Sequence, residues 1–168
     1  VCHDADGNVK WEESFPNLVN AVGKQLMLDT LLRTSGTYTT TGPFLGLIAT
    51  TSPTFAASDT MTSHTGWTEF TNYTVGGSAV RGTAVFAAST STGTTPSNVT
   101  TSAATAITYT ITGAGGNVTG CFLCTGSGAV STQSSTAGTL YSAGAFATAK
   151  TVTAGDTVSV TYSTTATS

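Results

Sequence analysis

The chain has 168 residues, which is enough for one domain with a single buried core. Charged residues make up only 8% and the net charge is −3, so the chain lacks the basic stripe that binds nucleic acid. No apolar run approaches the roughly 18 residues of a membrane-spanning helix. We therefore expect neither nucleic acid nor a membrane as a partner.

Thr and Ser together make up roughly a third of the chain, far above ordinary usage. Thr is β-branched and suits the outer face of a β-sheet. A surface with so little charge does little to repel neighbouring molecules and is typical of a protein packed in an assembly. A secreted or cell-surface β-domain is the alternative that this composition leaves open.

Residues 1–13 are predicted to form a β-hairpin. Asp6-Gly7 is a strong two-residue turn signal. Val9 and Trp11 then alternate with polar residues, as on a strand with one buried face.

The acidic residues of this hairpin also have the spacing that begins a calcium-binding loop. Asp4, Asp6 and Asn8 would be its first ligands. Such a loop needs a glycine where Val9 stands and a glutamate where Phe15 stands, and both are missing. We therefore interpret these residues as turn residues, and we expect no bound metal and no cofactor.

A helix is predicted from Leu18 to about Leu32, because Pro16 ends any strand and Asn17 is a favourable cap. Gly23 inside it costs about 1 kcal/mol relative to Ala, which is acceptable where a close contact uses the missing side chain. The apolar positions cover more than half of the helix circumference: Leu18, Val19, Ala21, Val22, Leu26, Met27, Leu28, Leu31 and Leu32. Such a helix needs packing partners on more than one side.

Residues 36–168 are predicted to form an antiparallel β-sandwich of about eight strands. The strand candidates include residues 44–49, 69–75, 79–87, 107–112, 118–124, 140–146 and 158–162. Residues 89–103 are predicted to be an exposed loop, and residues 58–67 a helical turn. The chain is thus mainly β and a single domain, with residues 1–35 as an N-terminal hairpin plus helix. Ig-like and jelly-roll connectivities both remain open.

The register of the later strands follows from their alternation of apolar residues with hydroxyl residues. The expected core positions are Ile107, Tyr109, Ile111, Val118, Phe122, Val158 and Val160. The expected outward positions are Thr108, Thr110, Thr157, Ser159 and Thr161. A register error of one residue would exchange the two sets.

The cysteines form no recognisable metal site. Cys121 and Cys124 have CxxC spacing, but residues three apart on a strand point to opposite faces. No second CxxC and no nearby histidine completes a ligand set. We interpret both as structural thiols, and Cys2 as a free thiol.

No catalytic constellation is recognisable either. His3 and His64 are the only histidines, and no GxSxG motif accompanies them. Glu12 and Glu13 are adjacent on a predicted strand and diverge, which does not suit a glycosidase pair. We therefore expect no enzyme activity and no small-molecule substrate.

Three aromatic residues, Trp67, Phe70 and Tyr73, follow one another at intervals of three. Aromatic rings can line a sugar site, but they also anchor loops to a core. We favour the anchoring role here. We interpret His64, in the same stretch, as a local hydrogen-bonding residue.

Several stretches resemble a family of small virion proteins encoded by tailed bacteriophages. Residues 4–32, DADGNVKWEESFPNLVNAVGKQLMLDTLL, are similar to the family's front end. Residues 59–73, DTMTSHTGWTEFTNY, are similar to its middle motif. The segments GCFLCTGS, GTLYSAGAF and AGDTVSVTY, between residues 120 and 162, are similar to its closing strands, although Cys121 and Cys124 replace small or apolar residues there.

The resemblance implies a structural virion protein, and first of all a capsid decoration or cement protein. Its partners would be the major capsid protein lattice, sister subunits in a homo-oligomer, or both. It would be made in the bacterial cytoplasm and located on the capsid exterior. The alternative is a tail, fibre or baseplate component whose sandwich recognises the host. The chain lacks the coiled-coil or collagen-like repeats of many fibres, which favours decoration.

In either case residues 8–32 are the expected docking segment. The large apolar side chains there are the kind that interfaces favour. The expected anchors are Trp11, Phe15, Leu18, Val22 and Leu26.

Overall fold

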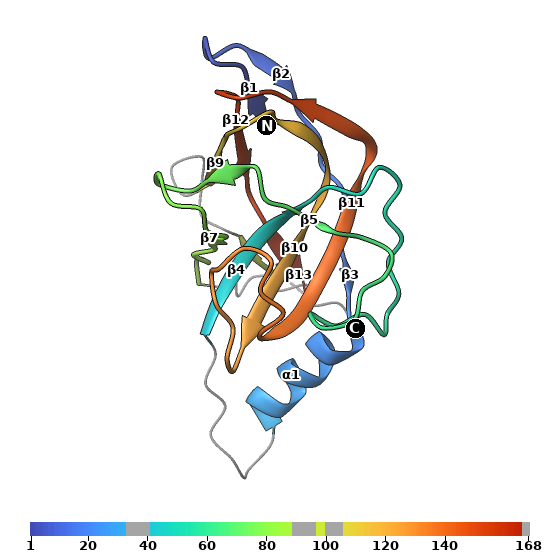
Figure 1. Cartoon of the computed structure of the whole chain (residues 1–168). Helices are drawn as coiled ribbons and strands as arrows, with labels where there is room; N and C mark the ends of the chain where they lie inside the picture. The colour runs from blue at the N-terminus through green and yellow to red at the C-terminus, as the bar shows by residue number, and fades with distance from the viewer. Residues whose placement is uncertain (33–40, 89–96, 100–105, 166–168) are drawn as a thin grey trace.

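The structure is a computed structural model that describes residues 1–32, 41–88, 97–99 and 106–165. It is an antiparallel β-sandwich of two sheets, and the described residues contain one helix (Figure 1). The fold class predicted from the sequence is confirmed. The sandwich is not a closed barrel.

The first sheet has the strand order β2-β1-β12-β9-β6. Its strands are β1 (Cys2–His3), β2 (Val9–Trp11), β6 (Tyr73–Thr74), β9 (Ile107–Ile111) and β12 (Thr157–Val160). The second sheet has the order β3-β11-β10-β4-β5, and β7 pairs with β4. Its strands are β3 (Leu18–Val19), β4 (Thr41–Ile48), β5 (Glu69–Phe70), β7 (Gly82–Thr83), β10 (Gly116–Gly126) and β11 (Thr139–Val152).

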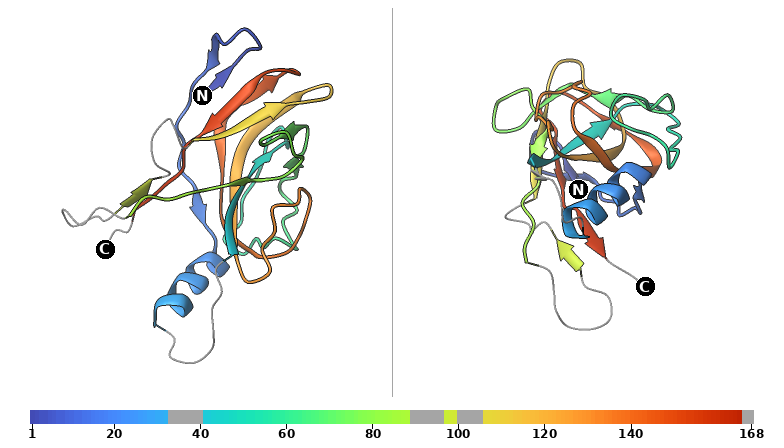
Figure 2. Two further views of the ribbon diagram at one scale, coloured as in Figure 1. Left: turned by 90° about the vertical axis from the view of Figure 1, so that its left-hand side faces the viewer. Right: turned by 90° about the horizontal axis from the view of Figure 1, so that it is seen from below.

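Two elements lie outside these sheets. The helix α1 (Ala21–Leu32) lies at one end of the sandwich, beside β11 (Figure 1). A short antiparallel ribbon, β8 (Ser97–Val99) with β13 (Ser163–Thr165), extends away from the sandwich body (Figure 2).

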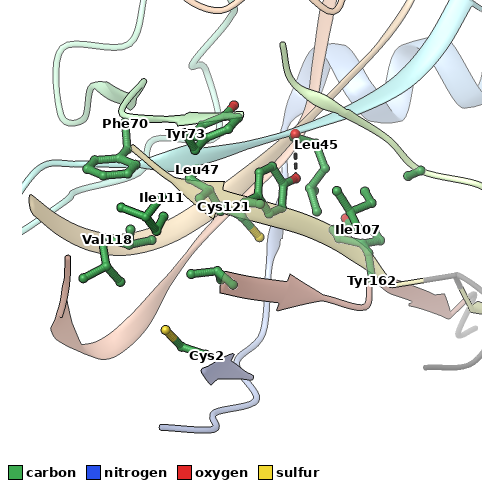
Figure 3. Close-up of a cluster of buried hydrophobic side chains, with 14 of the residues drawn as sticks. Cys2, Leu45, Leu47, Phe70, Tyr73, Ile107, Ile111, Val118, Cys121 and Tyr162 are labelled. Carbon is green, nitrogen blue, oxygen red and sulfur yellow. Dashed lines mark hydrogen bonds between the residues drawn. The ribbon is translucent and has the colours of Figure 1, made fainter. Parts of the chain in front are cut away.

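The predicted core register is confirmed for β9, whereas on β12 Val158 is buried as predicted but Val160 is only partly buried. On β9, Ile107, Tyr109 and Ile111 are buried and the two threonines between them are exposed. The hydroxyl of Tyr109 donates a hydrogen bond of 2.8 Å to the carbonyl of Leu45, across the gap between the sheets (Figure 3). Burial of the tyrosine ring therefore leaves its polar end satisfied.

The second sheet is buried on both faces. Its inner face packs against the first sheet, with Leu45, Leu47 and Cys121 in the shared core (Figure 3). Its outer face lies under the loops of residues 49–68 and 127–138, in a second cluster: Ile48, Met61, Trp67, Phe122, Cys124, Ala129, Leu140 and Ala143. Burial on both sides explains why β10 is a nearly continuous buried run.

The predicted helix start at Leu18 is wrong. Leu18 and Val19 form β3, paired with Ala143 and Ser142 of β11, and α1 begins only at Ala21. Pairing with a strand more than 120 residues later satisfies backbone groups at Leu18 and Val19, and no local cap signal reveals such a partner. The N-terminal hairpin is likewise part of a sheet, because β1 pairs with β12.

Three further predicted segments differ from the structure. Residues 69–75 form two strands rather than one, β5 in the second sheet and β6 in the first, so the chain crosses between the sheets there. Within residues 79–87 only Gly82–Thr83 is a strand, and residues 58–67 form turns with no helix. In the expected loop 89–103, residues 97–99 form β8, and the remainder lies outside the described residues.

The core register can be tested by truncating two side chains of the first sheet. Ile111 is 2% exposed, and its replacement by Ala is expected to lower the free energy of unfolding by about 2 to 5 kcal/mol. Val160 is only partly buried, so Val160→Ala should lower the free energy of unfolding by less than Ile111→Ala does. Urea unfolding of both variants checks this order, and an equal or reversed order would contradict the register.

Candidate docking surface

The start of α1 is fixed to two different parts of the chain. The Asn20 backbone N–H donates to the Tyr141 carbonyl of β11 at 3.0 Å. The Asn20 side-chain amide donates to the Ala56 carbonyl at 3.0 Å, and the Ala21 N–H donates to the Ala57 carbonyl at 2.8 Å. Because Asn20 is buried, these bonds define where the helix leaves the sandwich.

The first turns of α1 lie directly on the backbone of β11. A Cβ atom added at Gly23 would lie 2.5 Å from the Tyr141 carbonyl oxygen, which is closer than real contacts allow. One turn further, the Tyr141 hydroxyl donates to the Met27 sulfur at 3.2 Å. The glycine that weakens the helix locally is therefore the residue that permits its close docking on β11.

The contact at Gly23 can be tested with Gly23→Ala. The change favours the helix by about 1 kcal/mol in intrinsic propensity, but its methyl group collides with backbone atoms of Tyr141 that cannot move aside. We expect a net loss of about 1 to 3 kcal/mol in stability, as for overpacked sites, and faster amide exchange in residues 21–32. The control is Gln25→Ala at an exposed helix position, and a Gly23→Ala variant as stable as that control would contradict the close approach.

The second half of α1 exposes large apolar side chains. Met27, Leu28, Leu31 and Leu32 are 49%, 59%, 82% and 67% exposed, and we call these four residues the docking face. They are half of the eight exposed large hydrophobic side chains among the described residues. Their spacing along the helix places them side by side on neighbouring turns. A contiguous apolar patch of this kind marks an interaction surface, whereas single exposed apolar residues are ordinary.

None of the five predicted anchors belongs to the docking face. Residues 11–19 form an extended segment in which alternate residues are shielded, so Trp11 and Phe15 pack against Phe146 of β11 with ring centroids 5.3 and 4.8 Å apart. Val22 and Leu26 are partly buried, and Leu18 is 37% exposed. The most exposed large apolar residues of α1 are the later ones, which belong to the predicted apolar helix but not to the predicted anchors.

A crevice of about 540 Å³ lies beside Trp11 and Phe15. Its wall includes Glu13, which forms an ion pair of 2.6 Å with Lys150. The Glu13 carboxylate also accepts the Ala147 N–H at 2.5 Å. Lys150 and this N–H lower the pKa of Glu13. The carboxylate is therefore engaged in holding the N-terminal segment on β11.

The predicted hairpin turn is confirmed. The Asp4 carboxylate accepts the backbone N–H groups of Asp6 and Asn8 at 3.0 and 2.8 Å, and Gly7 has a φ of +87°. The hydrogen bond from the Asn8 side-chain amide, together with these backbone bonds, lowers the pKa of Asp4. Nowhere in the described part of the chain do three or more His, Cys, Asp or Glu side chains gather as a metal site would require.

The two cysteines of the CxxC spacing lie on opposite faces of β10, as predicted. Cys121 belongs to the core between the sheets, and Cys124 to the cluster on the outer face. Burial raises the pKa of Cys121 to about 12 and that of Cys124 to about 11. Cys2 is also a free thiol, and it is fully buried in the core, where burial raises its pKa.

These pKa values predict unreactive thiols in the folded state. A thiol whose pKa is raised on folding stays protonated at pH 8, whereas in the unfolded chain its pKa is about 8.5 and a reactive thiolate forms. We expect iodoacetamide at pH 8 to leave the native protein unmodified and to alkylate all three cysteines in urea. Mass spectrometry of the two samples checks this, and rapid alkylation of the native protein would contradict the burial of the thiols.

The aromatic residues at intervals of three are anchors, as predicted. Trp67, Phe70 and Tyr73 are 2%, 5% and 1% exposed. The ring of His64 stacks on Trp67 at 3.8 Å between centroids, and its Nδ1 lies 3.1 Å from the Trp67 carbonyl oxygen. The predicted local role of His64 is thus confirmed.

No helix among the described residues is long and apolar enough to cross a membrane. Comparisons with models of known protein families, with characterised proteins and with solved structures found no match to this chain.

Proposed function

We propose that this protein is a structural virion protein of a tailed bacteriophage that decorates the capsid. In this proposal the docking face of α1 binds the lattice of the major capsid protein, or a sister subunit on it. The observation that carries the proposal is the clustering of Met27, Leu28, Leu31 and Leu32 at the exposed end of one helix. The resemblance of residues 4–32 to the front end of phage virion proteins supports the same assignment.

The docking face is better suited to this contact than the sheet edges. Strands at the edge of a sheet can pair with another chain, but short edges resist such pairing. The strands at the ends of the two sheets are short: β2 has three residues, and β3, β5, β6 and β7 have two each. The helix instead offers apolar area without any requirement for backbone pairing, as in helix-in-groove recognition.

The size of the face indicates how the protein would bind. Burying a Leu or Met side chain completely contributes about 1.5 to 3 kcal/mol, and these four are already partly covered. The face alone would therefore contribute on the order of several kcal/mol, which corresponds to weak binding of one isolated copy. Repeated contacts on a lattice, or an oligomer that presents several faces, would make such binding stable.

The proposal can be tested on particles that lack the protein. The purified chain is added back to virions made without its gene, and the copies are located by electron microscopy. Decoration predicts many copies arranged over the capsid facets. A few copies at the tail would favour the alternative of a tail, fibre or baseplate component. Failure of the folded chain to bind the particle at all would overturn the virion assignment.

A further inference from the structure

A second cavity, of about 260 Å³, lies on the outer face of the second sheet, under the loops of residues 49–68 and 127–138. Its walls include His64, Trp67, Glu69, Arg81 and Ser135. None of the docking-face residues lines it, and the inference below does not depend on the proposed function.

One wall of the cavity is a buried ion pair. Arg81 is 1% exposed and donates from Nε to Glu69 Oε1 at 2.9 Å and from Nη2 to Oε2 at 2.7 Å. The same Nη2 donates to the Ser135 carbonyl at 2.7 Å, and the guanidinium carbon lies 5.0 Å from the centroid of the Phe122 ring. The third nitrogen, Nη1, is buried and has no hydrogen-bond partner among the described residues.

The indole of Trp67 provides a second unpartnered donor. Its Nε1 is buried and likewise without a partner in the described part of the chain. The ring centroid lies 5.0 Å from that of Phe122, the ring on which Arg81 also packs. Buried N–H groups are almost always hydrogen-bonded, because leaving one unpaired costs about 1 to 3 kcal/mol. Both residues line the cavity, and an oxygen-bearing ligand there would supply acceptors for these two donors.

The loop over the cavity is held in a strained conformation. Ser134 has a φ of +60°, the only positive value among the described residues other than glycine. Its N–H donates to Glu69 Oε2 at 2.8 Å, so the strained residue helps to orient the carboxylate that fixes Arg81. Backbone strain of this kind costs about 1 to 3 kcal/mol and is concentrated at binding sites.

The charges and the size of the cavity define the class of ligand. The Arg81–Glu69 pair is neutral overall, and an anion would bring a second negative group close to the Glu69 carboxylate. A volume of about 260 Å³ is below the usual range for drug-sized ligands and far more than one water needs. The His64 ring covers one face of the indole. We propose that the cavity binds a small neutral molecule rich in hydroxyl groups, of the class of a single sugar ring.

The test uses the two tryptophans of the chain as paired reporters, because the Trp11 Nε1 is likewise buried without a partner among the described residues, but Trp11 lines the separate crevice. The ¹⁵N-labelled protein is titrated with glucose, galactose, mannose and N-acetylglucosamine, and with acetate as the anion. The expected result is a saturable shift of the Trp67 indole N–H resonance with at least one sugar, while the Trp11 resonance stays unchanged. No shift at Trp67 with any sugar, a shift with acetate alone, or a shift at Trp11 instead would each overturn the proposal.

Matched variants then show whether the two donors bind the ligand. Trp67→Phe keeps an aromatic ring but removes the indole N–H, and Arg81→Lys keeps the charge but removes Nη1. We expect each to weaken sugar binding about tenfold, which is the effect of about 1.4 kcal/mol, as measured by saturation-transfer NMR on the sugar. Trp11→Phe is the control and should bind like the original protein. Equal affinity of all folded variants would contradict the assignment, and the titration of the original protein remains decisive if a variant does not fold.

Discussion

Replacement of Arg81 by Met is expected to lower the free energy of unfolding by about 3 to 5 kcal/mol, because it leaves a buried carboxylate without its partner. The side chains of Arg81 and Glu69 are only 1% and 8% exposed. Burial alone would lower the pKa of Arg81, but the hydrogen bonds to Glu69 raise it above the ordinary value, so the guanidinium stays charged. Such a loss is a large fraction of the about 5 to 15 kcal/mol that stabilises an ordinary protein.

A second ion pair provides the control for this prediction. Lys150 and Glu13 are 19% and 15% exposed, so water screens their attraction, and Lys150→Met should cost under about 1 kcal/mol. The double variant Glu69→Leu, Arg81→Met removes both buried charges and should recover much of the stability that Arg81→Met loses. Urea unfolding measures the free energy of unfolding of all three variants. If Arg81→Met lost no more stability than Lys150→Met, the Arg81–Glu69 pair would not be a buried ion pair on which the fold depends.

Replacement of Leu28 and Leu31 together by Ser is expected to remove most of the binding to the particle without loss of the fold. The two side chains are 59% and 82% exposed in the free protein, so the sandwich does not depend on them. If both become buried on docking, the loss is about 2 to 3 kcal/mol, which weakens binding about 30- to 150-fold. Sedimentation of the particles with the added chain measures this change in affinity.

The control replaces exposed apolar side chains elsewhere on the molecule by the same residue, Ser. Val85 and Val130 are 60% and 38% exposed and lie outside residues 8–32, so Val85→Ser with Val130→Ser should bind like the original protein. Circular dichroism and urea unfolding show whether both double variants remain folded. Equal loss of binding in the two pairs would mean that the contact is not specific to the docking face.

The features that the sequence predicts correctly depend on residues that are close together in the chain. Side chains alternate between the two faces of a strand, so the apolar positions of residues 107–111 indicate which residues point into the core. The same rule places Cys121 and Cys124 on opposite faces of β10, and the structure confirms it. The turn at Gly7 is also local, because its conformation depends on neighbouring residues alone.

The features that the sequence does not predict depend on distant partners. Pro16 and Asn17 resemble a helix start, but pairing with β11 takes Leu18 and Val19 into the second sheet. The excess of apolar residues on α1 was predictable from the sequence. Which of those residues remain exposed was not, because that depends on the face that the backbone of Tyr141 covers.

The cavity on the outer face could be recognised only in part from the sequence. Arg81 stands in the apolar stretch AVRGTAVFAA, in a chain with only five Lys and Arg residues, and a charge in such surroundings signals a buried pair. Its partner Glu69 lies twelve residues earlier, on β5. The loop with Ser134 joins them from much later in the chain, which no periodicity or spacing indicates.

Hydrogen exchange of the chain, free and bound to the particle, tests the docking proposal most directly. Exchange is measured on the isolated protein and on particles saturated with it, and the peptides that slow on binding define the contact. We expect the strongest protection on binding in residues 21–32, around the docking face. Protection confined to the sandwich loops or the β8–β13 ribbon, with residues 21–32 exchanging as in the free protein, would contradict it.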